Sequence, residues 1–216
     1  MAPRGGPVSL EPAQLDPADY FAALQGGSQA ERVFHGARVA LLKAALPSPS
    51  GRVLEIGAGS GGIAVPLAEA GHNVTAVEVG FEHLARLRDY AMDRGLAIPV
   101  VQADGRRLPF AEGTFDVVIL ASVVHLAAQP GPLLREAERV CADDGTLLVA
   151  GPWRHHPKTN RLIKTILRGG RAPETKTQPF SKDLVRRYLG ASELVRRDRD
   201  YAMGYDVTVW RRLARS

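Results

Sequence analysis

A glycine-rich loop headed by an acidic residue is the most informative segment of this sequence for chemistry. It reads Glu55-Ile-Gly-Ala-Gly-Ser-Gly-Gly62 and follows a short apolar run that predicts a buried strand. Glycines let the backbone approach a ligand closely, and a following helix N-terminus favours a negative group. The glycine spacing also fits the G-x-G-x-x-G pattern of dinucleotide-binding oxidoreductases. Glu55 argues against that ligand, because a carboxylate repels a pyrophosphate and attracts an ammonium group.

Two further acids stand at the ends of predicted strands. Glu78 follows the strand 74–77, at the spacing expected of a carboxylate that accepts hydrogen bonds from ribose hydroxyls. Asp104 follows the strand 99–103 and is placed to accept a hydrogen bond from an adenine amino group. Because ligands of parallel sheets bind at the carboxyl ends of the strands, these acids predict an acidic cleft for a cationic nucleoside. Each acid taken singly has an equally good structural explanation: Glu55 as a surface residue, Glu78 as an N-cap and Asp104 as a turn-forming residue.

The elements that must position these acids alternate along the middle of the chain. The patterns predict strands at 53–56, 74–77, 99–103, 115–120 and 146–150, and helices at 63–70, 81–94 and 132–141. This alternation indicates an α/β fold with a doubly wound, mostly parallel sheet. Residues 194–201 and 206–213 predict an antiparallel pair of strands at the sheet edge, preceded by a helix that Ser181 caps.

The 216 residues are enough for one domain with a substantial core. Proline and glycine in residues 1–17 predict a flexible N-terminal arm, and residues 18–216 predict a single domain. Within that domain we expect an N-terminal helical cap at 18–46, a ligand-binding core at 51–151, a basic substrate-side insertion at 153–192 and a C-terminal hairpin at 193–214. Gly26-Gly27-Ser28 divides the cap into two predicted helices.

Composition excludes several classes of protein. Hydrophobic residues make up 45% and charged residues 24%, which excludes wholesale disorder. The single cysteine, Cys141, excludes an internal disulfide and a cysteine-based zinc cluster. The adjacent histidines His155 and His156 point in different directions, so we predict no metal site. Without a membrane-spanning apolar run or a secretory signal, the expected location is the cytoplasm.

Positive charge is concentrated in one stretch of the chain. The net charge is +5, yet residues 154–187 alone hold ten lysines and arginines against two acids. Such a stretch is either a solvated face or a surface for an acidic substrate, a nucleic acid or an anionic membrane. Single-strand binding favours aromatic residues between the charges, and only Phe180 meets that description. Nucleic acid is therefore possible but not favoured.

One set of motifs spans the middle of the chain: Val53–Gly61, Val77-Glu78, Ala103-Asp104, Leu108–Phe110 and Phe115–Ile119, with the segments 133–140 and 144–148. In combination, these motifs resemble those of class I S-adenosylmethionine-dependent methyltransferases. The resemblance covers residues 51–151 and is greatest to the small-molecule, methyltransferase-11-like type. It implies a Rossmann-like seven-stranded sheet whose last two strands form the C-terminal hairpin. It also implies S-adenosylmethionine as cofactor and methyl transfer to O, N or C of a small-molecule acceptor.

The same resemblance implies which residues bind the cofactor. Glu55 would face the methionine ammonium, Glu78 the ribose hydroxyls and Asp104 the adenine. The implied cofactor-binding set is Glu55, Gly57, Ala58, Gly59, Gly61, Glu78, Val79, Asp104, Gly105 and Ala121.

Methyl transfer from a sulfonium is an in-line displacement that depends on alignment, and it needs a base only when the acceptor is protonated. His125, after the fourth predicted strand, is the candidate base for a hydroxyl or an amine, with a packing histidine as the alternative. Ser122 has a smaller claim to that role. The candidate acceptor-binding residues are Tyr20, His125, Trp153 and Arg154, which bring aromatic surface and positive charge and so allow for an acidic acceptor.

Three other functions stay open from the sequence. The basic stretch fits an RNA or protein methyltransferase, and the glycine loop fits an NAD(P)-dependent oxidoreductase, which Glu55 and Asp104 disfavour. A binding module without turnover is the third. The resemblance argues against methylation of adenine or of glutamine amides, because no Asn/Asp-Pro-Pro-Tyr motif follows the fourth strand. Cys141, which we place inside a helix, argues against cytosine C5 methylation.

Overall fold

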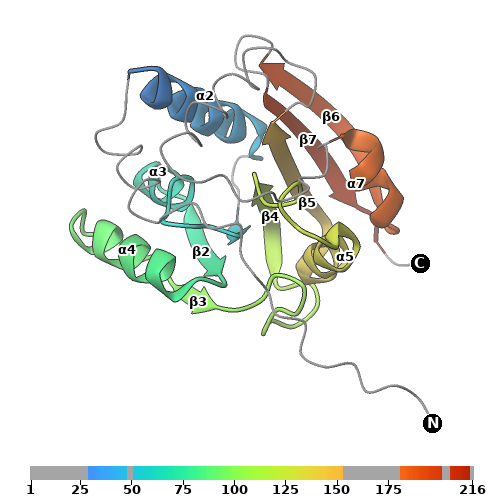
Figure 1. Cartoon of the computed structure of the whole chain (residues 1–216). Coiled ribbons are helices and arrows are strands. Elements are labelled where there is room, and N and C mark those ends of the chain that lie inside the picture. The colour runs from blue at the N-terminus through green and yellow to red at the C-terminus, as the bar shows by residue number, and fades with distance from the viewer. Residues whose placement is uncertain (1–28, 48–50, 153–180, 201–204, 215–216) are drawn as a thin grey trace.

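A seven-stranded sheet forms the centre of the computed structural model, which describes residues 29–47, 51–152, 181–200 and 205–214 (Figure 1). The strands are β1 (Arg52–Ile56), β2 (Asn73–Glu78), β3 (Val100–Gln102), β4 (Phe115–Ala121), β5 (Cys141–Pro152), β6 (Ser192–Asp200) and β7 (Tyr205–Arg212). Their order in the sheet is β3-β2-β1-β4-β5-β7-β6. The first five are parallel, and β7 runs antiparallel to both β5 and β6. The predicted fold, including the C-terminal hairpin, is confirmed.

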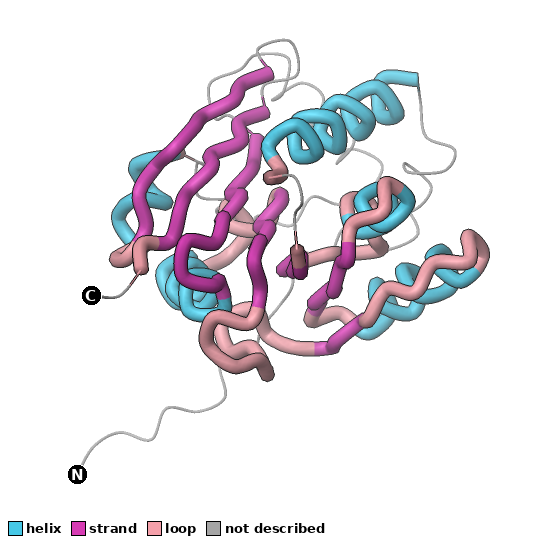
Figure 2. The backbone as a smooth tube through the Cα atoms, turned by 180° about the vertical axis from the view of Figure 1, so that it is seen from behind, coloured by secondary structure: helices cyan, strands magenta, loops and turns pink. Residues whose placement is uncertain are grey.

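Helices pack on both faces of this sheet, as the view from behind also shows (Figure 2). They are α2 (Gln29–Ala45), α3 (Ala64–Glu69), α4 (Phe81–Met92), α5 (Pro130–Val140) and α7 (Lys182–Tyr188). Apolar residues of α2, α3 and α4 join one buried cluster, and those of α5 and α7 join the other. The doubly wound arrangement follows, because each parallel crossover carries a helix to one face.

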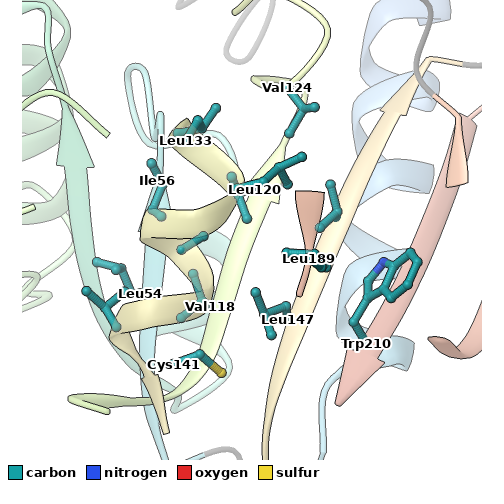
Figure 3. Packing of buried hydrophobic residues seen from close by; sticks show 14 of the residues in the cluster. Leu54, Ile56, Val118, Leu120, Val124, Leu133, Cys141, Leu147, Leu189 and Trp210 are labelled. Carbon is teal, nitrogen blue, oxygen red and sulfur yellow. The ribbon is translucent and has the colours of Figure 1, made fainter. Parts of the chain in front are cut away.

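Alternation along the strands explains the two clusters. In β4, Val117 and Ile119 pack with α2, α3 and α4, whereas Val118 and Leu120 face α5. Figure 3 shows the second cluster, in which Val118 and Leu120 lie between the α5 side and Trp210 of β7. Strands that are buried on both faces have continuous apolar sequences, and this pattern made β4 recognisable in the sequence.

The predicted end of the helix 132–141 is wrong. Cys141 is not inside a helix, because α5 ends at Val140 and Cys141 takes an extended conformation at the start of β5, paired with Phe115. The side chain is fully buried at this position, where burial raises the pKa of its thiol to about 12. The predicted helix before Gly26 lies outside the described residues.

The helix capped by Ser181 forms as predicted. The side chain of Ser181 accepts a hydrogen bond of 3.1 Å from the backbone N–H of Leu184. This contact caps the N-terminus of α7. After α7, the chain is held by Glu138 of α5, which accepts hydrogen bonds from the backbone of Gly190 and Ala191 and from the hydroxyl of Ser192. These contacts connect α5 to the start of β6.

A buried arginine, Arg212, lies at the end of the sheet opposite to the carboxyl ends of the parallel strands. The side chain of Arg212, 2% exposed, donates to Glu112 at 2.6 Å, to the carbonyl of Arg139 at 2.9 Å and to the carbonyl of Cys141. Asp143 lies 3.5 Å away. Removing one partner of a buried charged network leaves the others without compensation.

We predict that Arg212→Met lowers the free energy of unfolding by about 3 kcal/mol, since it removes the buried guanidinium that donates to the carbonyls of Arg139 and Cys141 and pairs with Glu112. Chemical denaturation of the purified variant measures this loss. Arg52→Met is the matched control, because Arg52 pairs with Asp116 at 3.3 Å on the surface, with side chains 54% and 45% exposed. Its expected cost is below about 1 kcal/mol. Equal losses in the two variants would contradict the structural role of Arg212.

Candidate cofactor and acceptor site

The glycine loop turns sharply between β1 and α3. Gly57, Gly59 and Gly61 have φ of 75°, 54° and 89°, a region that residues with a Cβ rarely adopt. A Cβ at Gly57 would also lie 2.8 Å from Val123 Cγ2. The N–H groups of Gly57 and Ala58 donate to the carbonyl of Val77 at 2.8 and 3.0 Å, which holds the loop against the end of β2. The loop therefore forms a glycine cradle that is held against β2, with Gly57 and Gly59 partly exposed.

Glu55 lies beneath this cradle, on β1, and is 2% exposed. The backbone of Ala64, at the start of α3, donates a hydrogen bond to its carboxyl group. The other oxygen, Oε2, is buried and has no hydrogen-bond partner. Burial raises the pKa of the Glu55 carboxyl to about 8, against the opposing effect of the Arg38 guanidinium. Such a group is stable as a carboxylate only when a cation reaches it.

In the predicted acidic cleft, the charge of Glu55 therefore depends on what is bound. With no cation bound, its side chain is neutral at pH 7, because desolvation disfavours the charged form. The alternative of a surface Glu55 is also wrong, since the residue is buried.

Helix α2 brings in a charged side chain that the sequence analysis did not single out. Arg38 is 8% exposed, and its charge acts on Glu55, His35 and His125. Its guanidinium carbon lies 5.2 Å from the centre of the Tyr205 ring. A signal was present in the sequence, because positions 38, 42 and 45 fall on one face of the helix, and in the structure all three are buried. An arginine on the apolar stripe of a helix is a candidate ligand-binding residue.

His35 connects α2 to the glycine loop. Its ring is hydrogen-bonded to the backbone of Gly62. Burial, together with the charge of Arg38, lowers the pKa of His35 to about 4, so the ring is neutral at pH 7.

Glu78, the last residue of β2, ties two loops together. One of its oxygens accepts the N–H of Gly59 at 2.9 Å, and the other accepts those of Val79 and Gly80 at 2.8 and 3.0 Å. The carboxylate therefore lies directly beside the cradle, and its charge contributes to the high pKa of Glu55. Val79, next in the chain, is 39% exposed. Glu55 and Glu78, which we expected at the carboxyl ends of neighbouring strands, thus lie close enough for their charges to interact.

Asp104 follows β3 and is held by a neighbouring arginine. Arg106 donates to both oxygens, at 2.8 Å from Nη2 and 3.1 Å from Nε. Hydrogen bonds from Arg106 hold the pKa of Asp104 below its usual range. At Gly105, a Cβ would lie 2.7 Å from Ile56 Cγ2, so this turn packs directly against β1. The Asp104 carboxylate is charged, with part of its hydrogen-bonding capacity satisfied within the loop.

The residues after β4 complete the described part of the site. Ala121 ends the strand and is 6% exposed, and Ser122 has a φ of 63°. The Ser122 hydroxyl lies 2.9 Å from the phenol oxygen of Tyr205 on β7. His125 is half-buried, and its Nδ1 atom is buried without a hydrogen-bond partner.

Three of the predicted acceptor-binding residues, Tyr20, Trp153 and Arg154, lie outside the described residues, as does most of the basic stretch 154–187. Within the described ranges, no three metal-binding side chains come together. No helix in the part of the chain that the structure describes is long and apolar enough to cross a membrane.

This arrangement suits a ligand that is positively charged at one end and rich in hydroxyls. Glu55 provides a buried carboxyl group that ionises when a cation binds, Arg38 provides a positive charge that acts on it, and Glu78 provides an acceptor for hydroxyl groups. The orphaned Oε2 of Glu55 requires a donor, and an ammonium group supplies one. A pyrophosphate at the same position would face the buried Glu55 and the Glu78 carboxylate.

Comparisons with known proteins agree with this chemistry. Residues 54–149 match the family model of a methyltransferase domain. An uncharacterized protein of Mycobacterium tuberculosis (strain ATCC 25618 / H37Rv) is 36% identical over 126 residues, 58% of this chain and 46% of that protein. A ubiquinone biosynthesis O-methyltransferase of Caulobacter sp. (strain K31) is 37% identical over 117 residues, 53% of this chain and 43% of that enzyme. The chain thus spans about half the length of the curated relatives it matches.

A solved structure extends the likeness to almost the whole fold. Magnesium protoporphyrin IX methyltransferase from Synechocystis PCC 6803, with bound SAH, superposes with a TM-score of 0.71 at 18% identity, covering 90% of this chain and 93% of that one. The segment that matches the methyltransferase domain contains most of β1, the glycine loop and the strand ends that carry Glu55 and Glu78, so this region of the chain is similar to a methyltransferase domain.

Proposed function

We propose that this protein is an S-adenosylmethionine-dependent methyltransferase that acts on a small-molecule acceptor. The observation that carries the proposal is Glu55, a buried carboxyl with one unpaired oxygen beneath the glycine cradle. The methionine part of the cofactor carries an ammonium and a carboxylate. Glu55 takes the ammonium, and Arg38, whose charge already acts on Glu55, takes the carboxylate.

The remaining cofactor contacts come from residues at the carboxyl ends of the strands and from the glycine loop. Glu78 accepts hydrogen bonds from the ribose hydroxyls, for which its carboxylate retains one lone pair, on the oxygen that accepts the N–H of Gly59. Asp104 accepts the adenine amino group, and the exposed side chain of Val79 contacts the adenine ring. The backbone of Gly57 to Gly61 passes under the methionine and ribose, with Ala58, Gly105 and Ala121 close by. S-adenosylmethionine supplies an activated methyl group, and the chain supplies binding, alignment and exclusion of water.

A small-molecule acceptor agrees with the likeness to the ubiquinone biosynthesis O-methyltransferase. The basic stretch 154–187 keeps RNA or protein as the second candidate, since it carries ten basic residues. Titration with RNA at several salt concentrations distinguishes the two acceptor classes. A log–log slope of several units favours the second, and no measurable binding favours the first.

Isothermal titration calorimetry of the intact protein tests cofactor choice. We expect saturable binding of S-adenosylmethionine and none of NADH, because a pyrophosphate would face Glu55 and Glu78. Binding of NADH alone would overturn the proposed function in favour of an oxidoreductase.

Glu78→Ala is predicted to weaken cofactor affinity at least tenfold, a cost of about 1.4 kcal/mol or more, since it removes the ribose acceptor and loosens Gly59. Calorimetry of the purified variant measures the change in Kd. Glu82→Ala, in the first turn of α4, is the control and leaves the affinity as it was. An unchanged affinity in the Glu78 variant would refute the ribose assignment.

Cofactor binding near pH 7 is predicted to release a proton. The pKa of Glu55 is about 8 in the ligand-free protein, and a bound ammonium lowers it, so the carboxyl ionises on binding. Calorimetry in buffers of different ionisation enthalpy counts the protons released. The Glu55→Gln variant should bind more weakly and release none. Equal proton release by wild type and variant would contradict the assignment.

Glu55 also predicts a pH-dependent stability. Its pKa is 4.5 in the ordinary state and about 8 when folded, so between these values the unfolded chain loses a proton that the folded chain keeps. Stability therefore falls as pH rises through this window. Without cofactor at pH 8, Glu55→Gln should be more stable than wild type by over about 1.4 kcal/mol, the equivalent of one pKa unit. Denaturation at pH 5 and pH 8 measures the gain, and a gain independent of pH would contradict the burial argument.

A further inference from the structure

Beyond the end of β4, two hydroxyl side chains from distant parts of the sequence meet, and a histidine lies on the same turn. Ser122 follows the strand, His125 lies three residues later, and Tyr205 comes from the start of β7. The hydroxyl groups of Ser122 and Tyr205 are 2.9 Å apart, and Tyr205 is 1% exposed. The turn after β4 thus carries a paired hydroxyl and an imidazole, and the charge of Arg38 acts both on this imidazole and on Glu55.

The backbone at Ser122 is held in an unfavourable conformation. Its φ of 63° is in the left-handed region, and its N–H donates to the carbonyl of Ala150 at 2.8 Å. Strain of this kind in a non-glycine residue persists where the surroundings impose it, often at functional sites. Here the hydrogen bond to β5 and the contact with Tyr205 impose it, and together they fix the turn on which His125 lies.

His125 has an unused hydrogen-bonding atom. Nδ1 is buried and has no partner, although buried polar atoms are normally paired. Burial, aided by the charge of Arg38, lowers the pKa of the imidazole to about 4, so the ring is neutral at pH 7. With its proton on Nε2, the ring presents Nδ1 as an acceptor for a donor that the protein itself does not supply.

A weakly basic histidine discriminates between classes of methyl acceptor. A protonated amine has no lone pair and must lose its proton before it attacks, which a base this weak does not achieve. A hydroxyl group already has lone pairs, and it becomes strongly acidic only as its oxygen gains the methyl group. A weak, well-placed acceptor then suffices, because the proton moves during the transfer.

On the basis of the proposed function, we propose that the acceptor is a hydroxyl compound, a phenol, enol or alcohol, whose O–H donates to Nδ1 of His125 beside the Ser122–Tyr205 pair. The acceptor oxygen forms a bond to the methyl carbon as the carbon–sulfur bond breaks, and sulfur keeps that electron pair. The hydroxyl proton passes to Nδ1. The imidazolium that results, beside Arg38, returns the proton to water, and the products are a methyl ether and S-adenosylhomocysteine.

The test follows the methyl group itself, so the acceptor need not be identified beforehand. The intact protein is incubated with S-adenosylmethionine labelled with ¹³C in its methyl group and with a bacterial metabolite extract. Carbon–proton correlation spectra then show whether the label is bound to oxygen, nitrogen or carbon. We expect a methyl ether. Label on nitrogen or carbon, or no labelled product from a protein that binds the cofactor, overturns the proposal.

Variants separate the proton acceptor from a packing residue. His125→Gln should lower kcat by 10² to 10⁴ while the calorimetric Kd for S-adenosylmethionine stays within twofold. Tyr205→Phe keeps the ring against Arg38 and removes the hydroxyl, so it should raise the KM of the acceptor more than it lowers kcat. His72→Gln, just beyond the end of α3, is the control.

A wild-type kcat in His125→Gln overturns the role of Nδ1. If calorimetry of the wild type detects no S-adenosylmethionine binding, the proposed function itself fails, and the acceptor assignment with it. The binding measurement therefore distinguishes the two failures.

Discussion

The burial of one carboxyl group is the constraint on which this site depends. Glu55 lies within β1, shielded from water, with one oxygen held by the N-terminus of α3 and the other unpaired. An unpaired buried polar atom destabilises a fold, so its presence calls for a partner that arrives from outside. In the proposed complex, the ammonium group of the cofactor satisfies that oxygen and restores the charge of the carboxylate. Ligand binding and the ionisation of Glu55 are then one event, and the ligand-free protein carries the cost of preparing for it.

The fold gathers the other parts of the site around this residue. The parallel strands β1, β2 and β4 deliver Glu55, Glu78 and the turn of His125 to one edge of the sheet, where their carboxyl ends meet. Helix α2 closes over that edge with Arg38, and the antiparallel strand β7 brings Tyr205 from the far end of the chain. The proposed acceptor site thus takes residues from the C-terminal hairpin as well as from the matched methyltransferase domain.

Local patterns in the sequence predicted the sheet, the glycine loop, the hairpin and the strand-end acids, because each depends on residues close together in the chain. What they missed depends on tertiary contact. The pairing of Ser122 with Tyr205 joins residues 83 positions apart, and the neutral state of Glu55 depends on how deeply it is buried. Arg38 is an intermediate case, since its place on the apolar stripe of a helix was visible but its neighbours were not. Cys141 was misplaced because strand pairing with Phe115, not helical periodicity, decides its conformation.

A crystal structure of the protein with S-adenosylhomocysteine tests the central claim most directly, since this product keeps the amino and carboxylate groups of the cofactor. The account predicts the amino nitrogen within hydrogen-bond distance, about 3 Å, of Oε2 of Glu55, with the glycine cradle beneath the ligand. An amino group directed elsewhere, while Oε2 of Glu55 stays buried and unpaired, would contradict it.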